Sequence, residues 1–185
     1  MDYFKKICKE SIIIVILSSI IGIFSGSILS TSQEILYSFP IILLILPALN
    51  SLTGDIATVL VSRLTTHLYI GIIPPKIQKS KRLTSDFIGL LLTLILSLIA
   101  LIIIGYTLGF LTGIQIVNPF LIIMIITISI LILFILMFIL LFISSIVIFK
   151  RGKDPNNFLI PLTTSLADFL TPLLLIIFIK IFIFY

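Results

Sequence analysis

Charge is what this sequence has least of. Only 10% of its 185 residues are Asp, Glu, Lys or Arg, whereas about a quarter are charged in a soluble domain. Hydrophobic residues make up 60% of the chain, and the mean hydropathy is +1.40. These values exclude a water-soluble globular domain and are typical of a protein surrounded by membrane lipid.

Cysteine and histidine are almost absent as well, with one residue of each. The lone Cys8 cannot form a disulfide framework or a cysteine metal site within one chain. Soft metals usually recruit more imidazole or thiolate than His67 alone offers, so we expect His67 to be a hydrogen-bonded bystander. The net charge of +5 could suggest a nucleic-acid partner, but the basic residues punctuate apolar runs and do not form a water-exposed binding face.

Five apolar runs are long enough to cross a bilayer as helices, which takes about 20 residues. They lie at about 11–30, 38–73, 86–111, 118–149 and 157–184. The sequence therefore predicts an all-α integral membrane protein with five transmembrane helices, forming a single domain over residues 1–185. The first run also resembles a signal peptide, because lysines precede it and small residues follow.

The second run is longer than one crossing requires and contains Pro47, Asn50 and Gly54. We expect this helix to be broken near residues 47–55. Glycines spaced four apart, at Gly22 and Gly26 and again from Gly105 to Gly113, predict close helix packing.

Basic residues predict the orientation. Ten of the twelve lysines and arginines lie in the N-terminal segment and in the second-to-third and fourth-to-fifth connections, while the other two connections have none. Because basic connections stay on the cytoplasmic side, we expect the N-terminus inside and the C-terminus outside.

Two of the seven acidic residues, Asp55 and Asp168, lie deep inside apolar runs, whereas Asp86 and the other four lie at run ends or in loops. An unpartnered carboxylate at mid-bilayer costs roughly 2.5–3.5 kcal/mol on insertion scales. We therefore expect both to face the bundle interior, a cavity or an ion.

Helical periodicity surrounds each of these acids with polar residues. One predicted polar face carries Pro161, Thr164, Ser165, Asp168 and Thr171. A second face carries Asp55, Thr58 and Ser62, and the two faces could meet around one aqueous path. Arg63, on the second run, is expected to extend to the inner headgroups.

Oxygen is nearly the only ligand type available at this depth, from carboxylates, hydroxyls, the Asn50 amide and loosened backbone carbonyls. Oxygen ligands favour hard cations. A sparse carboxylate site suits Mg²⁺, which loses its waters reluctantly and is usually bound through one or two carboxylates.

Two stretches, Pro47–Leu64 and Asp154–Asp168, resemble the signature segments of the MgtE/SLC41 superfamily of magnesium transporters. The resemblance covers nearly the whole chain. It implies that Asp168 recognises hydrated Mg²⁺ in a pore at a dimer interface, and that a bend at Thr53 and Gly54 lends carbonyl oxygens. The ligand set that we predict is Asp168, Asp55, Asn50, Gly54, Thr53, Thr164 and Thr171, with Thr58, Ser62, Ser165, Pro161 and Arg63 lining the pore or supporting it.

The chain departs from the family pattern at Asp55, where bacterial members have asparagine. It has the length of one membrane half, so the resemblance implies a second copy, or a paralogous half, as its partner in the plasma membrane. We expect any control by cytosolic sensing domains to come from another protein.

Three alternatives remain at this point. The same superfamily includes members proposed to exchange Na⁺ for Mg²⁺, so a Na⁺- or H⁺-coupled exchanger is one. An intramembrane aspartyl protease also uses two aspartates, but its Gly-x-Gly-Asp and Tyr-Asp motifs are not found around Asp55 and Asp168. An accessory subunit, whose acids pair with basic residues of another protein, is the third.

Overall fold

The structure, a computed structural model, describes residues 2–183, with side-chain surroundings described from residue 12 onward. Five long helices, each apolar enough to cross a membrane, account for most of the chain, and the described residues include no strand. The predicted all-α architecture with five spans is confirmed. The long helices are α1 (Asp2–Thr31), α3 (Pro40–Tyr69), α4 (Lys81–Leu111), α5 (Pro119–Lys150) and α6 (Pro155–Ile183), and a short α2 (Gln33–Tyr37) joins α1 to α3.

The helix boundaries follow from the residues that flank them. The helices α3, α5 and α6 each begin at a proline, a residue that suits the first turn because the amide it lacks would be unpaired there. Glycines with positive φ follow three of the helices: Gly71 at 73°, Gly113 at 72° and Gly152 at 69°. Such glycines end helices because only they adopt this conformation without strain.

The predicted break near residues 47–55 is wrong, because α3 is one continuous helix with Pro47 inside it. A proline removes one backbone donor, but here the chain on both sides of it keeps helical geometry. Within the same helix the hydroxyl of Thr53 donates to the carbonyls of Leu49 and Asn50, at 3.0 Å each.

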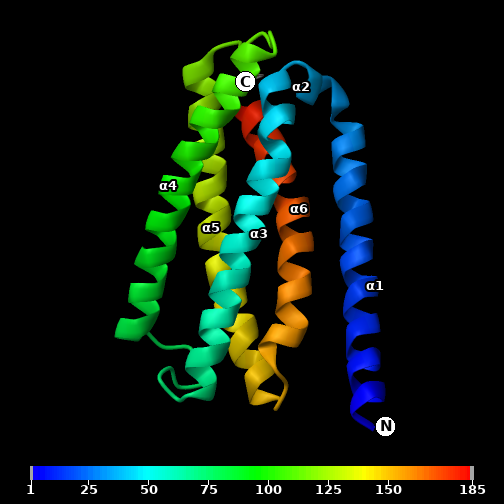
Figure 1. Cartoon of the computed structure of the whole chain (residues 1–185), viewed down its shortest axis with the longest axis vertical. Helices are drawn as coiled ribbons and strands as arrows, with labels where there is room; N and C mark the ends of the chain where they lie inside the picture. The colour runs from blue at the N-terminus through cyan, green and yellow to red at the C-terminus, as the bar shows by residue number, and fades with distance from the viewer. Residues whose placement is uncertain (1, 184–185) are drawn as a thin grey trace.

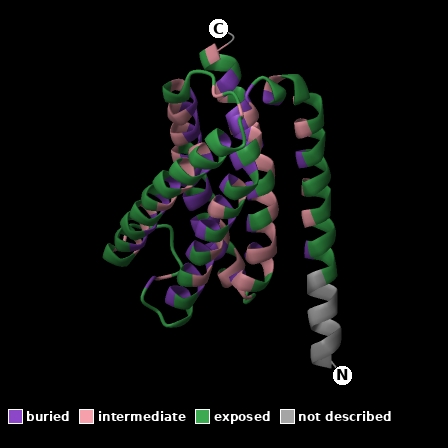
Figure 2. Cartoon of the chain, turned by 45° about the horizontal axis from the view of Figure 1, so that its top comes forward, coloured by how far each residue is buried: buried purple, intermediate pink, exposed green. Residues whose placement is uncertain are grey.

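Helices α3, α5 and α6 form the centre of the bundle, α4 leans on α3, and α1 lies along α6 (Figure 1). Burial is uneven between them. Half of the most apolar 18-residue stretch is buried in α3 and in α5, but only 11% of the corresponding stretch in α1. Residues 12–31 of α1 are mostly exposed (Figure 2).

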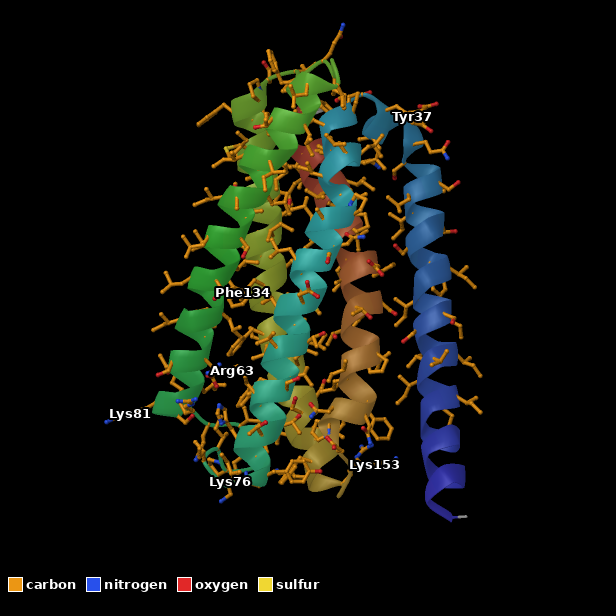
Figure 3. The ribbon with its side chains drawn as sticks, viewed as in Figure 1. Tyr37, Arg63, Lys76, Lys81, Phe134 and Lys153 are labelled. Carbon is orange, nitrogen blue, oxygen red and sulfur yellow. The ribbon has the colours of Figure 1, made fainter. Side chains whose placement is uncertain are left out.

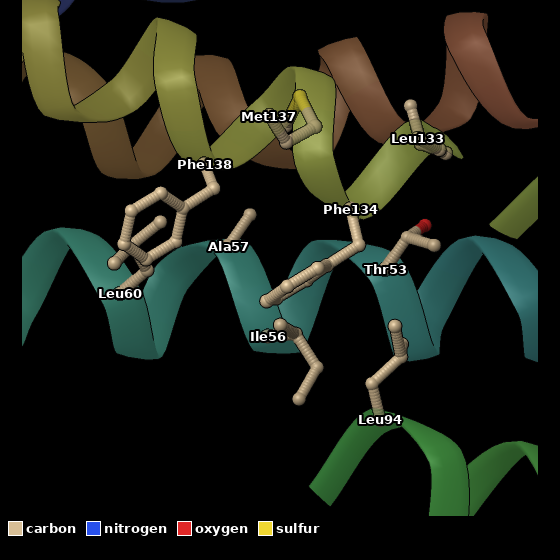
Figure 4. A pocket seen from close by; sticks show the side chains of 9 residues that line it. All are labelled: Thr53, Ile56, Ala57, Leu60, Leu94, Leu133, Phe134, Met137 and Phe138. Atoms are coloured by element: carbon tan, nitrogen blue, oxygen red, sulfur yellow. The ribbon is translucent and has the colours of Figure 1, made fainter. Parts of the chain in front are cut away.

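The interface between α3 and α5 is apolar and nearly solid. Phe134, Met137 and Phe138 of α5 pack against Ile56 and neighbouring residues of α3 (Figure 4). The cavity left between them measures about 20 Å³ and has almost no polar surface, so it offers a water molecule no partners. An aqueous path through this chain therefore cannot follow the α3–α5 interface.

A buried polar cluster joins α3 to α4. The Asp86 side chain is fully buried, and its Oδ1 accepts hydrogen bonds from Nε and Nη2 of Arg63 at 3.0 and 2.6 Å. Nε2 of His67 lies 3.0 Å from Oδ2 of Asp86, and Arg82 lies 3.2 Å from the same His67 nitrogen. Asp86 lies near the start of its apolar run, as predicted, and the structure adds that it is a buried counter-ion for Arg63, which has a structural role at α4.

The basic residues of two connections gather at one end of the bundle. Lys76, before α4, Lys81, at the start of α4, and Lys153, before α6, lie at the same end, and Tyr37 lies at the other (Figure 3). The orientation itself, with the N-terminus inside, stays a prediction.

Two glycines of α4 allow it to approach α3 closely. A Cβ at Gly105 would overlap Cγ2 of Ile45, and a Cβ at Gly109 would lie 2.7 Å from Cδ1 of Ile41. The predicted packing role of these two is confirmed. Gly22 and Gly26 of α1, in contrast, have nothing within 4 Å of the Cβ position, so among the described residues their spacing supports no close helix approach.

The ion pair predicts a stability effect. Arg63→Ala leaves the Asp86 carboxylate buried without its closest cation, which should destabilise the fold by about 3 kcal/mol. Thermal unfolding in detergent measures this. Arg63→Ala combined with Asp86→Ala should lose less than the two single changes added together, because the double variant buries no lone charge. Strict additivity would show that the pair is not coupled.

The glycine contact predicts a second effect. Gly105→Ala should lower stability by about 1–3 kcal/mol, as overpacking does, because Ile45 is only 2% exposed and has little room to move. Gly89→Ala is the matched control, since Gly89 lies on the same helix with nothing within 4 Å. Equal thermal midpoints for the two variants would contradict the close approach of α4.

Candidate cation site

An open cavity of about 420 Å³ lies between α3 and α6, with the end of α1 at its rim. One water takes up about 30 Å³ in the liquid, so there is room for a cation that keeps its inner shell of water. Its lining residues come from three helices: Leu29 of α1, Leu46, Pro47, Asn50, Ser51, Gly54 and Asp55 of α3, and Thr164 and Asp168 of α6.

The two intramembrane carboxylates meet at this cavity, as the sequence predicts. Asp55 is the sixteenth of the 30 residues of α3, and Asp168 is the fourteenth of the 29 in α6, so both lie halfway along their helices. Both are exposed. Among the residues that the structure describes, every ion pair involves Asp86 and none involves Asp55 or Asp168. The cavity therefore holds two negative charges that the rest of the described chain leaves unpaired.

Neutral oxygen atoms complete the lining. The Asn50 amide lies close to the Asp168 carboxylate, and its Oδ1 is buried with no hydrogen-bond partner. The Ser51 hydroxyl lies 3.5 Å from Oδ2 of Asp55, and Thr164 is exposed at the rim. Within residues 12–183, no group of three or more His, Cys, Asp or Glu side chains could hold a metal ion. The site is thus sparse and built from oxygen, which suits a hard cation.

Gly54 lies against α6 beside the cavity. A Cβ at this position would lie 3.7 Å from the Cα of Thr164 and 3.8 Å from the Cβ of Ala167, which is ordinary packing contact. Since α3 is unbroken, the bend that the sequence resemblance implies at Thr53 and Gly54 is not present.

Other predicted ligands lie between the helices and not in the cavity. Thr53 and Thr171 are buried, and their hydroxyls lie 3.1 Å apart. The hydroxyls of Thr58 and Thr163 form a similar contact at 3.3 Å. The structure thus places Thr53, Thr58 and Thr171 as interhelical hydrogen-bond partners that hold α3 against α6.

The remaining predicted residues extend from the cavity toward the basic end. Ser62 of α3 and Pro161 and Ser165 of α6 are half-buried, and the Ser165 hydroxyl lies 3.5 Å from the Pro161 carbonyl. They do not line the cavity itself. Arg63 points to Asp86 of α4 and is likewise absent from the cavity lining.

One contact of the site comes from a helix that the sequence reasoning left out. The Ser25 hydroxyl of α1 donates to the backbone carbonyl of Asp168 at 2.5 Å. A signal for it was present, because Pro172 follows Asp168 by four residues and leaves that carbonyl without its helical donor.

Comparison with known families agrees with this geometry. No curated protein and no solved structure gives a significant match. The family model MgtE, described as a divalent cation transporter, matches residues 46–178. This range begins at the cavity-lining part of α3, ends within α6 and covers most of the chain. The chain therefore belongs to the MgtE family of divalent cation transporters.

Proposed function

We propose that this protein is a magnesium-type channel or transporter whose pore is lined by Asp168 and Asp55 and completed by a second copy of the chain. The observation that carries the proposal is the pair of unpaired carboxylates at mid-helix depth around one open cavity. Transport, and not catalysis, is the activity of the family.

The driving force follows from the charge of the ion. A membrane potential supplies about 2.3 kcal/mol per elementary charge per 100 mV, hence about 4.6 kcal/mol for a divalent cation moving inward. Uptake then needs no coupled ion. The carboxylates would offset the cost of bringing the cation to the centre of the bilayer, while retained waters would fill most of its coordination shell.

The exposure of the site supports the second copy. In a single chain, Asp55 and Asp168 open to the outside of the bundle, where lipid would otherwise meet them. Lipid cannot solvate a carboxylate, so another protein surface with water between the two is the physically acceptable neighbour. A symmetric partner would add its own pair of carboxylates opposite the first. A paralogous half would serve the same purpose in the plasma membrane.

Asp168 gives the first test of the proposal. Asp168→Asn removes the charge but keeps the shape, and should reduce Mg²⁺ flux into liposomes at least tenfold, because the neutral amide does not attract a cation at mid-bilayer. Glu34→Gln is the matched control, since Glu34 is an exposed acid of α2 outside the cavity. Flux should be measured with no Na⁺ and no pH gradient. Unchanged flux in Asp168→Asn would remove this residue from the path, and flux that requires either gradient would show a coupled exchanger.

Asp55 gives the second test. Asp55→Asn restores the residue that the bacterial members carry and keeps an oxygen ligand at the cavity. We expect it to retain more flux than Asp168→Asn, with a loss of less than about tenfold, because asparagine is the residue of the bacterial pattern at this position and Asp168 keeps its charge at the cavity. The same liposome assay measures it. If Asp55→Asn proves the more damaging change, then Asp55 is the principal ion-binding residue.

A further inference from the structure

The carbonyl of Asp168 has no donor within its own helix. In an α-helix this carbonyl would accept from the amide of residue 172, but Pro172 has no amide hydrogen and lies inside α6. At this depth an unpaired carbonyl is costly, because lipid offers no hydrogen bond to replace the missing one. Some other group must therefore satisfy it.

Ser25 of α1 supplies that group. Its hydroxyl donates to the Asp168 carbonyl at 2.5 Å, and Ser25 is only 6% exposed on a helix that is otherwise largely exposed. Serine and threonine hydroxyls inside helices usually bond to the carbonyl four residues back. Ser19 and Thr31 of the same helix do so, at 2.9 and 3.0 Å. Ser25 instead bonds across to α6, at the one carbonyl of the site that proline has freed.

We propose that Ser25 is a positioning residue for the cation site. By holding the Asp168 carbonyl toward α1, it fixes the backbone that carries the carboxylate and so keeps that carboxylate directed into the cavity. The inference rests on the proposed function of Asp168. It adds α1 to the working parts of the protein, although α1 lies outside the residues that match the family model.

A second contact between the same helices provides an internal comparison. Ser18 of α1 donates to the Pro161 carbonyl of α6 at 3.1 Å. Ser18 precedes Ser25 by seven residues, and Pro161 precedes Asp168 by seven, so the two contacts are equivalent along the helix pair. The residue four positions after Pro161 is Ser165, which has an amide hydrogen, so this carbonyl keeps a helical donor. In both contacts a serine hydroxyl donates to a backbone carbonyl of α6. Only the Asp168 carbonyl lacks its helical donor and therefore depends on the serine.

The test compares ion affinity in variants of the whole chain reconstituted in liposomes. Ser25→Ala should raise the Mg²⁺ concentration for half-maximal flux roughly fivefold, as expected for the loss of one buried hydrogen bond, with little change in maximal flux. Ser25→Thr keeps the hydroxyl and should behave as wild type. Ser18→Ala should leave half-saturation unchanged. If Ser18→Ala raises it as much as Ser25→Ala does, the effect is general helix packing and the inference is overturned.

Pro172→Ala provides a rescue that a merely structural serine would not show. The alanine amide restores a helical donor to the Asp168 carbonyl, so Ser25→Ala should have no further effect on half-saturation in that background. An undiminished effect there would overturn the inference. If Ser25→Ala does not yield folded protein by size exclusion, Ser25→Cys, a weaker donor, should give an intermediate shift, and a wild-type value for it would count against the proposal.

The failure of this inference can be told apart from failure of the proposed function. Normal half-saturation in Ser25→Ala, together with loss of flux in Asp168→Asn, would overturn the role of Ser25 alone. Normal flux in Asp168→Asn would instead overturn the pore assignment, whatever the serine variants do.

Discussion

An uncompensated carboxylate in the middle of a membrane is the constraint on which this structure depends. Such a charge is tolerated only beside water, a counter-charge or an ion. Near the start of α4, Asp86 is fully buried and is paired with Arg63 of the neighbouring helix. Halfway along α3 and α6, Asp55 and Asp168 instead keep their charge open to a cavity. The first arrangement fastens helices together, and the second leaves negative charge for something that enters from outside.

The packing of the bundle keeps these two arrangements apart. Apolar side chains fill the interface of α3 with α5 and leave it dry, while the ion pair and Gly105 hold α4 on another side of α3. The side of α3 that faces α6 carries the carboxylate of Asp55 and several hydroxyls. The hydroxyl contacts between Thr53 and Thr171 and between Thr58 and Thr163 consolidate that interface without consuming the acids.

The sequence could predict depth but not direction. The length of the apolar runs was enough to find five spans, and the position of Asp55 and Asp168 within them was enough to find the cavity. Which way a side chain turns depends on the neighbouring helix. The pairing of Asp86 was not predicted because its partner Arg63 lies 23 residues earlier and meets it only when α3 and α4 pack. The same limit applies to Thr53. Periodicity places it near Asn50, but only the packed structure shows that its hydroxyl contacts Thr171 and does not line the cavity. It applies also to Ser25, whose acceptor lies 143 residues away.

Proline shows why backbone and side chain must be considered together at this site. Pro172 frees the Asp168 carbonyl, and one reading of such a carbonyl is that it serves the ion directly. Here that oxygen is already occupied by Ser25, and α3, which contains Pro47, remains a continuous helix. The charge at the cavity comes from the side chains of Asp55 and Asp168. In the proposed function, a cation that interacts mainly with these carboxylates can keep its waters. This is the behaviour expected of Mg²⁺, which gives up its hydration shell reluctantly.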